Sequence, residues 1–139
     1  SQVASGARGF LSKAITVATM RQQSGDIHHL VPKDYLQKNG FPDRGDYNQV
    51  ANFALTETSI NVSISNRPPA DYMSLVDGQI VSGALKLGEI VDPLELERNL
   101  AENAIPHGFR SVDATGFPDF LVQRRQLMAS AVRRYYELL

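Results

Sequence analysis

The stretch Gly25-Asp26-Ile27-His28-His29-Leu30-Val31-Pro32 places two of the chain's three histidines side by side in an apolar run. The run predicts a short strand over 27–31, which ends at Pro32 because proline has no backbone N–H to donate within a sheet. Titratable groups at the end of a strand are a frequent setting for functional sites. In a plainer interpretation the pair has no functional role, and one imidazole is packed in the core while the other is solvated. The surrounding residues must decide between the two.

The composition predicts one globular domain. A chain of 139 residues with 42% hydrophobic and 21% charged residues can bury a core without metal or disulfide support, and it is neither disordered nor a coiled coil. The chain has no cysteine, which excludes disulfides and thiolate zinc sites. It has no apolar run of membrane-spanning length and no secretory signal, so we expect a cytoplasmic location without a membrane partner.

The charge is balanced, with 14 Lys+Arg against 15 Asp+Glu and a formal net charge of -1. Such a chain has no overall positive field for nucleic acid, so phosphate groups would have to be bound locally. The first residue is Ser rather than Met. We therefore expect the chain to be a piece of a longer protein.

Apolar periodicity predicts mainly helices around two strands. The string at 49–56 is mostly apolar and fits a second strand or the start of a helix, and periodicity does not decide between them. A polar loop is predicted over 41–47. Helices are predicted over 7–22, 33–38, 58–64, from Pro68-Pro69 onward, over 92–105 and over 117–139.

The last two of these helices have clear apolar stripes. In the helix over 92–105 the stripe is expected to form a core face, and it consists of Leu94, Leu96, Leu100 and Ile105. In the helix over 117–139, Arg124, Arg125, Arg133 and Arg134 are expected to form a solvated face.

Two asparagines complete the pattern, since Asn52 opens and Asn61 closes the string NFALTETSIN, nine residues apart. Turn and cap chemistry is the commonest use of asparagine and stays open for each of them. Together, however, the paired histidines on a strand, a second strand near Asn52 and a short helix bearing Asn61 resemble the ββα-metal, or HNH, finger of the His-Me endonucleases. DIHHLVP and NFALTETSIN supply the elements of that motif in order.

More narrowly, GDIHHLVPKDYLQKNG, NQVANFALTETSIN and ISNRPPADYM resemble the C-terminal nuclease domain of GmrSD-type restriction proteins, over about residues 9–139. The resemblance implies an α+β, mostly helical fold. A finger core at about 25–66 would be embedded in a helical domain over 68–139 that has a long C-terminal helix. Residues 1–139 would be a single nuclease domain from the C-terminal part of a longer protein. Its missing partner would be an N-terminal nucleotide-hydrolysing domain.

The resemblance also implies a role for each site residue. His29 would be the general base, because a histidine can take a proton near neutral pH. His28 would bind a metal ion together with the amide oxygen of Asn61. Asn52 would fix the loop that presents the histidines. Strand alternation, independently of the resemblance, puts Asp26 on the face of His28, so its carboxylate would orient an imidazole or would itself be a metal ligand.

Two basic residues lie near these motifs in the sequence. Lys33 follows His29 by four positions, and Arg67 follows Asn61 by six. Each would contact phosphates that flank the scissile bond, or would simply be a solvated surface charge.

The function implied is a metal-dependent DNA endonuclease, the effector of a restriction or phage-defence protein, with Mg²⁺ or Mn²⁺ as cofactor. Other transition metals also suit a histidine and amide-oxygen site. Two alternatives stay open. One is a non-catalytic nucleic-acid or protein-binding module on the same scaffold, and the other is a nuclease that acts on RNA.

Overall fold

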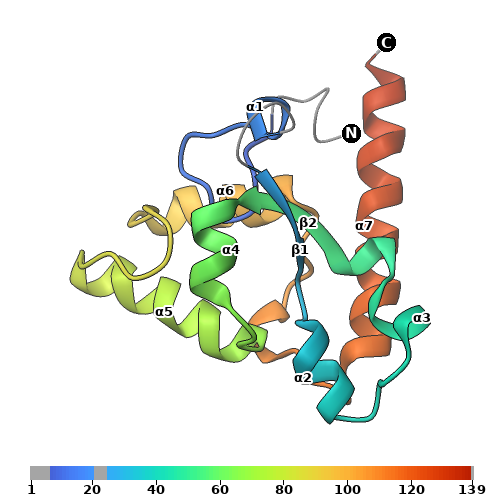
Figure 1. Ribbon diagram of the computed structural model, residues 1–139. Helices are drawn as coiled ribbons and strands as arrows, with labels where there is room; N and C mark the ends of the chain where they lie inside the picture. The colour runs from blue at the N-terminus through green and yellow to red at the C-terminus, as the bar shows by residue number, and fades with distance from the viewer. Residues whose placement is uncertain (1–6, 21–24, 139) are drawn as a thin grey trace.

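The computed structural model describes residues 7–20 and 25–138, and its centre is a pair of short antiparallel strands (Figure 1). Strand β1 (Gly25–His29) pairs with β2 (Phe53–Glu57), in a register that sets Gly25 opposite Glu57 and His29 opposite Phe53. Helix α4 (Thr58–Ile64) begins directly after β2 and packs against both strands. The protein is thus α+β, with a small sheet in a mostly helical chain.

The connection between the two strands is built from short helical segments. Helix α2 (Lys33–Lys38) and helix α4 have the bounds that the sequence predicts. The predicted polar loop over 41–47 instead contains a helical turn, α3 (Arg44–Tyr47), whose Tyr47 is buried. The 3-10 turn η1 (Val50–Asn52) then leads into β2, which resolves the ambiguity over 49–56 in favour of a strand.

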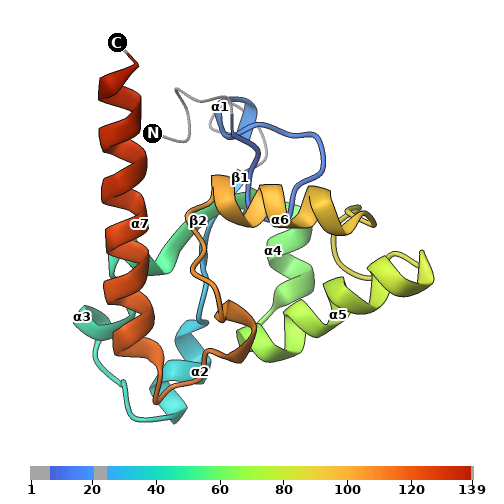
Figure 2. The same ribbon diagram turned by 180° about the vertical axis from the view of Figure 1, so that it is seen from behind.

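The remaining helices surround the strands. Their bounds are α5 (Pro69–Ser82), α6 (Pro93–Glu102), η2 (Phe109–Ser111) and α7 (Phe117–Glu137). Proline stands in the first turn of α5, α6 and α7, where a missing N–H costs nothing. Helix α7 stands along one side, and its C-terminal turns extend past the other labelled elements (Figures 1 and 2).

Aromatic rings join the N-terminal loop to η2 and α7. Phe10 lies 6.1 Å from Phe109 between ring centroids, and Phe109 lies 5.6 Å from Phe120 of α7. In α6, Leu96 and Leu100 face this core as predicted, but Leu94 is 75% exposed and was wrongly placed in the stripe. Leu94 is in the first turn, beside the residue that caps the helix. No helix of the described residues is long and apolar enough to cross a membrane.

The predicted helix over 7–22 is wrong for most of its described length. Only α1 (Val17–Met20) is helical, and residues 21 and 22 lie outside the described part. The preceding segment is a buried loop in which Leu11 has a φ of 61°. Asn99 of α6 accepts from the Leu11 N–H at 2.8 Å and donates to the Gly9 carbonyl at 3.0 Å. These tertiary bonds satisfy buried backbone groups that a helix would otherwise pair internally.

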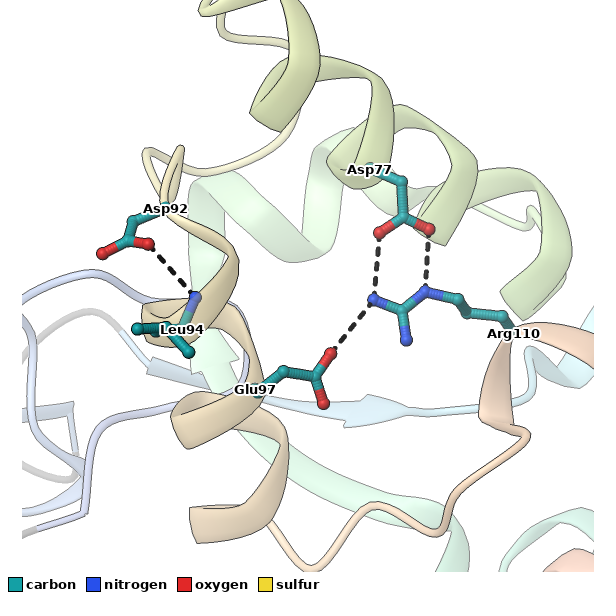
Figure 3. A network of polar contacts seen from close by, with 5 residues as sticks. All are labelled: Asp77, Asp92, Leu94, Glu97 and Arg110. Atoms are coloured by element: carbon teal, nitrogen blue, oxygen red, sulfur yellow. Dashed lines mark hydrogen bonds and ion pairs between the residues drawn. The ribbon is translucent and has the colours of Figure 1, made fainter.

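A polar network ties three helical elements together on the outside of the core (Figure 3). Arg110 of η2 donates two hydrogen bonds to Asp77 of α5, at 2.7 and 2.9 Å, and lies 3.6 Å from Glu97 of α6. Asp92 accepts from the Leu94 N–H at 3.1 Å and so caps α6. The side chains of Asp77, Glu97 and Arg110 are partly exposed, so their ion pairs add little to the free energy of unfolding. The network mainly fixes the positions of α5, α6 and η2 relative to one another.

Candidate metal and catalytic centre

The structure brings His28 of β1 and Asn61 of α4 together, although 33 residues separate them in the sequence. The Nδ1 atom of His28 lies 2.9 Å from the amide Oδ1 of Asn61. An amide oxygen can only accept, so Nδ1 donates in this arrangement. The other ring nitrogen, Nε2, is buried and has no hydrogen-bond partner among the described residues.

Asp26 fixes the orientation of that amide. Its carboxylate accepts from Asn61 Nδ2 at 3.2 Å and from the Thr58 hydroxyl at 3.1 Å. The Asn61 nitrogen is therefore turned toward Asp26 and the oxygen toward His28. Asp26 shares the strand face of His28 as expected, but the group that it holds is the amide rather than an imidazole.

The surroundings of His28 keep its ring neutral. The side chain is 3% exposed, stacked against Phe10 at 5.8 Å and edge-on to Tyr72 at 5.9 Å between ring centroids. Burial lowers the pKa of His28 to about 4, an effect that the Asn61 hydrogen bond opposes and the neighbouring His29 reinforces. A neutral imidazole is the form that binds metal ions.

The donor atoms fit a divalent cation. Two ligand atoms that bind an octahedral ion at right angles, each about 2.1 Å away, lie about 3 Å apart. The 2.9 Å between His28 Nδ1 and Asn61 Oδ1 matches that separation. Residues 7–20 and 25–138 contain no cluster of three His, Cys, Asp or Glu side chains that could hold a metal, so a cation here would depend on the amide and on water or substrate oxygens.

Binding at Nδ1 has a cost. The ring proton would have to move to Nε2, which lies among the aromatic rings without an acceptor. A buried N–H without a partner costs about 1–3 kcal/mol. The geometry therefore suits a weakly held cation better than a permanent structural one.

His29, the last residue of β1, lies in a different environment. Its Nε2 is 2.8 Å from Asn48 Oδ1, and its ring is edge-on to Phe53 at 5.0 Å and to Tyr47 at 6.1 Å. Successive strand residues point to opposite faces, and no hydrogen bond among the described residues joins His29 to the His28–Asn61 pair. The ring is half-buried.

Asn52 clamps the turn that follows the histidines, and its side chain is completely buried. Its Oδ1 accepts from the Val31 N–H at 2.9 Å, and its Nδ2 donates to the Val31 carbonyl at 3.0 Å and the Tyr47 carbonyl at 3.1 Å. Its backbone carbonyl accepts from Leu30 at 2.8 Å. Asn52 thus joins the chain after His29 to the segment that carries Asn48.

Arg124 of α7 is buried, with 2% of its surface exposed. The prediction that it lies on a solvated face was therefore wrong. It donates to the carbonyls of Ala51 at 3.0 Å, Phe53 at 2.6 Å and Asn103 at 3.0 Å. Burial lowers the pKa of Arg124 to about 10, so it stays a cation at neutral pH. Its position four residues after Phe120, on the apolar stripe, was the signal for burial.

The two expected phosphate contacts are both exposed. Lys33 places its Nζ 5.8 Å from the ring of Tyr47, the ring that also packs against His29. Arg67 follows α4 in the chain. Arg125, which was expected to be solvated, donates to the side chain of Gln49 at 3.0 Å, so a further cation lies near the segment beside His29.

Comparison of this chain with protein-family models, with curated proteins and with solved structures found no match. Any function must therefore be argued from the arrangement of the residues. That arrangement is a neutral imidazole paired with an amide oxygen, and a second histidine one residue away in a polar and aromatic setting.

Proposed function

We propose that this chain is a metal-dependent endonuclease of the HNH type, which hydrolyses phosphodiester bonds of DNA as the effector of a restriction or phage-defence protein. The observation that supports the proposal best is the 2.9 Å approach of His28 Nδ1 and Asn61 Oδ1 from two different elements. Two further observations support the proposal. The elements β1, β2 and α4 follow one another in the order of a ββα finger, and Asn52 clamps the turn that follows His29.

The metal ligands in this proposal are His28 and Asn61, with Mg²⁺ or Mn²⁺ as the ion. A bound divalent cation would neutralise the negative charge that develops on the phosphate oxygens. Burial prepares His28 for this role by keeping its ring unprotonated. Asp26 prepares Asn61 by holding the amide nitrogen, so that the oxygen faces the imidazole.

The general base is His29. Its imidazole takes a proton from water as the water oxygen bonds to phosphorus, and the bond from phosphorus to the leaving sugar oxygen breaks. The leaving oxygen ends as a hydroxyl after it takes a proton from solvent. Asn52 acts by position, because its bonds to Val31 and Tyr47 fix the backbone on either side of the site. Lys33 and Arg67 would bind flanking phosphates of the substrate.

The test is plasmid nicking by the purified chain in Mg²⁺ or Mn²⁺, with a chelator as the blank. Loss of a general base lowers rates by about 10²–10⁴-fold, so His29→Ala should nick at least about a hundred times more slowly. His107→Ala is the matched control, since His107 is an exposed histidine in a turn. Cleavage by His29→Ala at the rate of the control would overturn the assignment of the base.

The metal assignment has a separate test. Mn²⁺ binding followed by electron paramagnetic resonance should weaken at least tenfold in His28→Ala and in Asn61→Ala, and stay unchanged in the control. Parallel digestion of a structured RNA separates a DNA nuclease from an RNA nuclease. Salt-dependent DNA binding without metal-dependent cleavage would instead favour a binding module.

A further inference from the structure

The side chain of Asn48 contacts His29 in a way that decides which ring nitrogen bears the proton. His29 Nε2 lies 2.8 Å from Asn48 Oδ1, which can only accept. The hydrogen of the neutral ring must then be on Nε2, and Nδ1 keeps its lone pair. Nδ1 has no hydrogen-bond partner among the described residues, so it is the nitrogen available to an incoming proton.

Asn48 is itself held in place. Its backbone N–H donates to the Arg44 carbonyl at 2.9 Å, which ends α3. The next residue, Gln49, donates to the Gly45 carbonyl and accepts from Arg125 of α7 at 3.0 Å. Four residues after Asn48, Asn52 is bonded to Val31. Asn48 is thus presented to His29 from a short segment that is tied down on both sides.

The ring plane of His29 is set by other residues. Phe53 and Tyr47 both meet the imidazole edge-on, at 73° and 63° between ring planes. These contacts restrict rotation of the ring but do not distinguish its two nitrogens. Among the described residues the only hydrogen bond of the His29 side chain is the one that it donates to Asn48, so the choice of tautomer depends on that bond.

We propose that Asn48 is a positioning residue for His29, which holds the imidazole as the Nε2–H tautomer and so makes Nδ1 the proton-accepting atom. The proposal rests on the proposed function, because it assigns His29 the role of base. The bond does not compete with that role, since Nε2 keeps its hydrogen when Nδ1 takes a second proton. Asn48 would touch neither the substrate nor a metal ion.

The first test is nitrogen NMR of His29 in the metal-free chain, which reports the tautomer without any cleavage. The wild-type protein should show one protonated nitrogen, Nε2. Asn48→Ala should show a mixture of tautomers, and Asn48→Asp, which keeps an acceptor oxygen, should restore the Nε2–H form. A wild-type ring protonated at Nδ1, or a ring that Asn48→Ala leaves unchanged, would overturn the proposal.

The second test is the nicking rate. Asn48→Ala should lower kcat about tenfold with little change in KM, and Asn48→Asp should stay within about threefold of wild type. Asn39→Ala is the control, since Asn39 is an exposed asparagine whose side chain makes one 2.7 Å bond, to the Tyr35 carbonyl. Equal losses in Asn48→Ala and Asn48→Asp would refute the positioning role. A wild-type chain that does not cut would count against the proposed function, while the NMR result would still decide the tautomer.

Discussion

Replacing Asn52 by alanine should cost the protein about 3 kcal/mol of its free energy of unfolding. The substitution removes three side-chain hydrogen bonds, two to Val31 and one to the Tyr47 carbonyl, at 2.9–3.1 Å. Each such bond contributes about 1 kcal/mol net. Because the site is 0% exposed, water does not replace the lost partners. A domain of this size is stable by roughly 5–15 kcal/mol, so the variant should still fold.

Equilibrium urea denaturation measures the loss. With a slope of about 1.5 kcal/mol per molar urea, the midpoint should fall by roughly 2 M. Asn39→Ala provides the comparison, since it removes one exposed hydrogen bond and should cost about 0.5 kcal/mol. If Asn52→Ala and Asn39→Ala lose the same stability, the buried clamp does not hold the turn after the histidines.

Three further predictions concern stability. The pKa of His28 is lowered from 6.5 to about 4, so between these values the unfolded chain binds a proton that the folded chain does not. In chelator, the free energy of unfolding should therefore fall by about 3 kcal/mol as the pH drops through this range, and His28→Gln should remove that dependence. Arg124→Met should cost about 2–4 kcal/mol in urea denaturation, against less than about 0.5 for the exposed Arg125→Met, because three backbone carbonyls lose their donor; equal losses would contradict this role. Gly88→Ala should lower thermal stability by about 2 kcal/mol or more and Gly83→Ala by only about 1, since both have positive φ but only at Gly88 would a Cβ meet a backbone oxygen, at 2.8 Å. Equal melting temperatures for the two variants would contradict the steric reason.

Local sequence patterns predicted the elements whose start and end depend on residues of the same segment. The helices over 33–38 and 58–64 have the predicted bounds, because Pro32 and the end of β2 mark their starts. The segment over 7–16 was missed because its apolar residues are buried in a loop whose backbone bonds to Asn99. No local pattern contains a partner from a distant helix.

In the candidate site, too, one contact was predicted and another was missed. The resemblance to the HNH finger implied that His28 lies near Asn61, and the structure brings them together because α4 directly follows the strand paired with β1. The contact of His29 with Asn48 depends on the short helix α3, which the polar composition concealed. The roles in metal binding and base catalysis stay predictions.

The bonds from Arg124 have a consequence for the order of assembly during synthesis. Both strands and every residue of the candidate site precede Arg124 in the chain. The carbonyls of Ala51 and Phe53 therefore gain the Arg124 guanidinium as their hydrogen-bond donor only after α7 has left the ribosome. A nascent chain that stops before α7 would lack the anchor beside Asn52, so the site would reach its final geometry only after α7 has been synthesised.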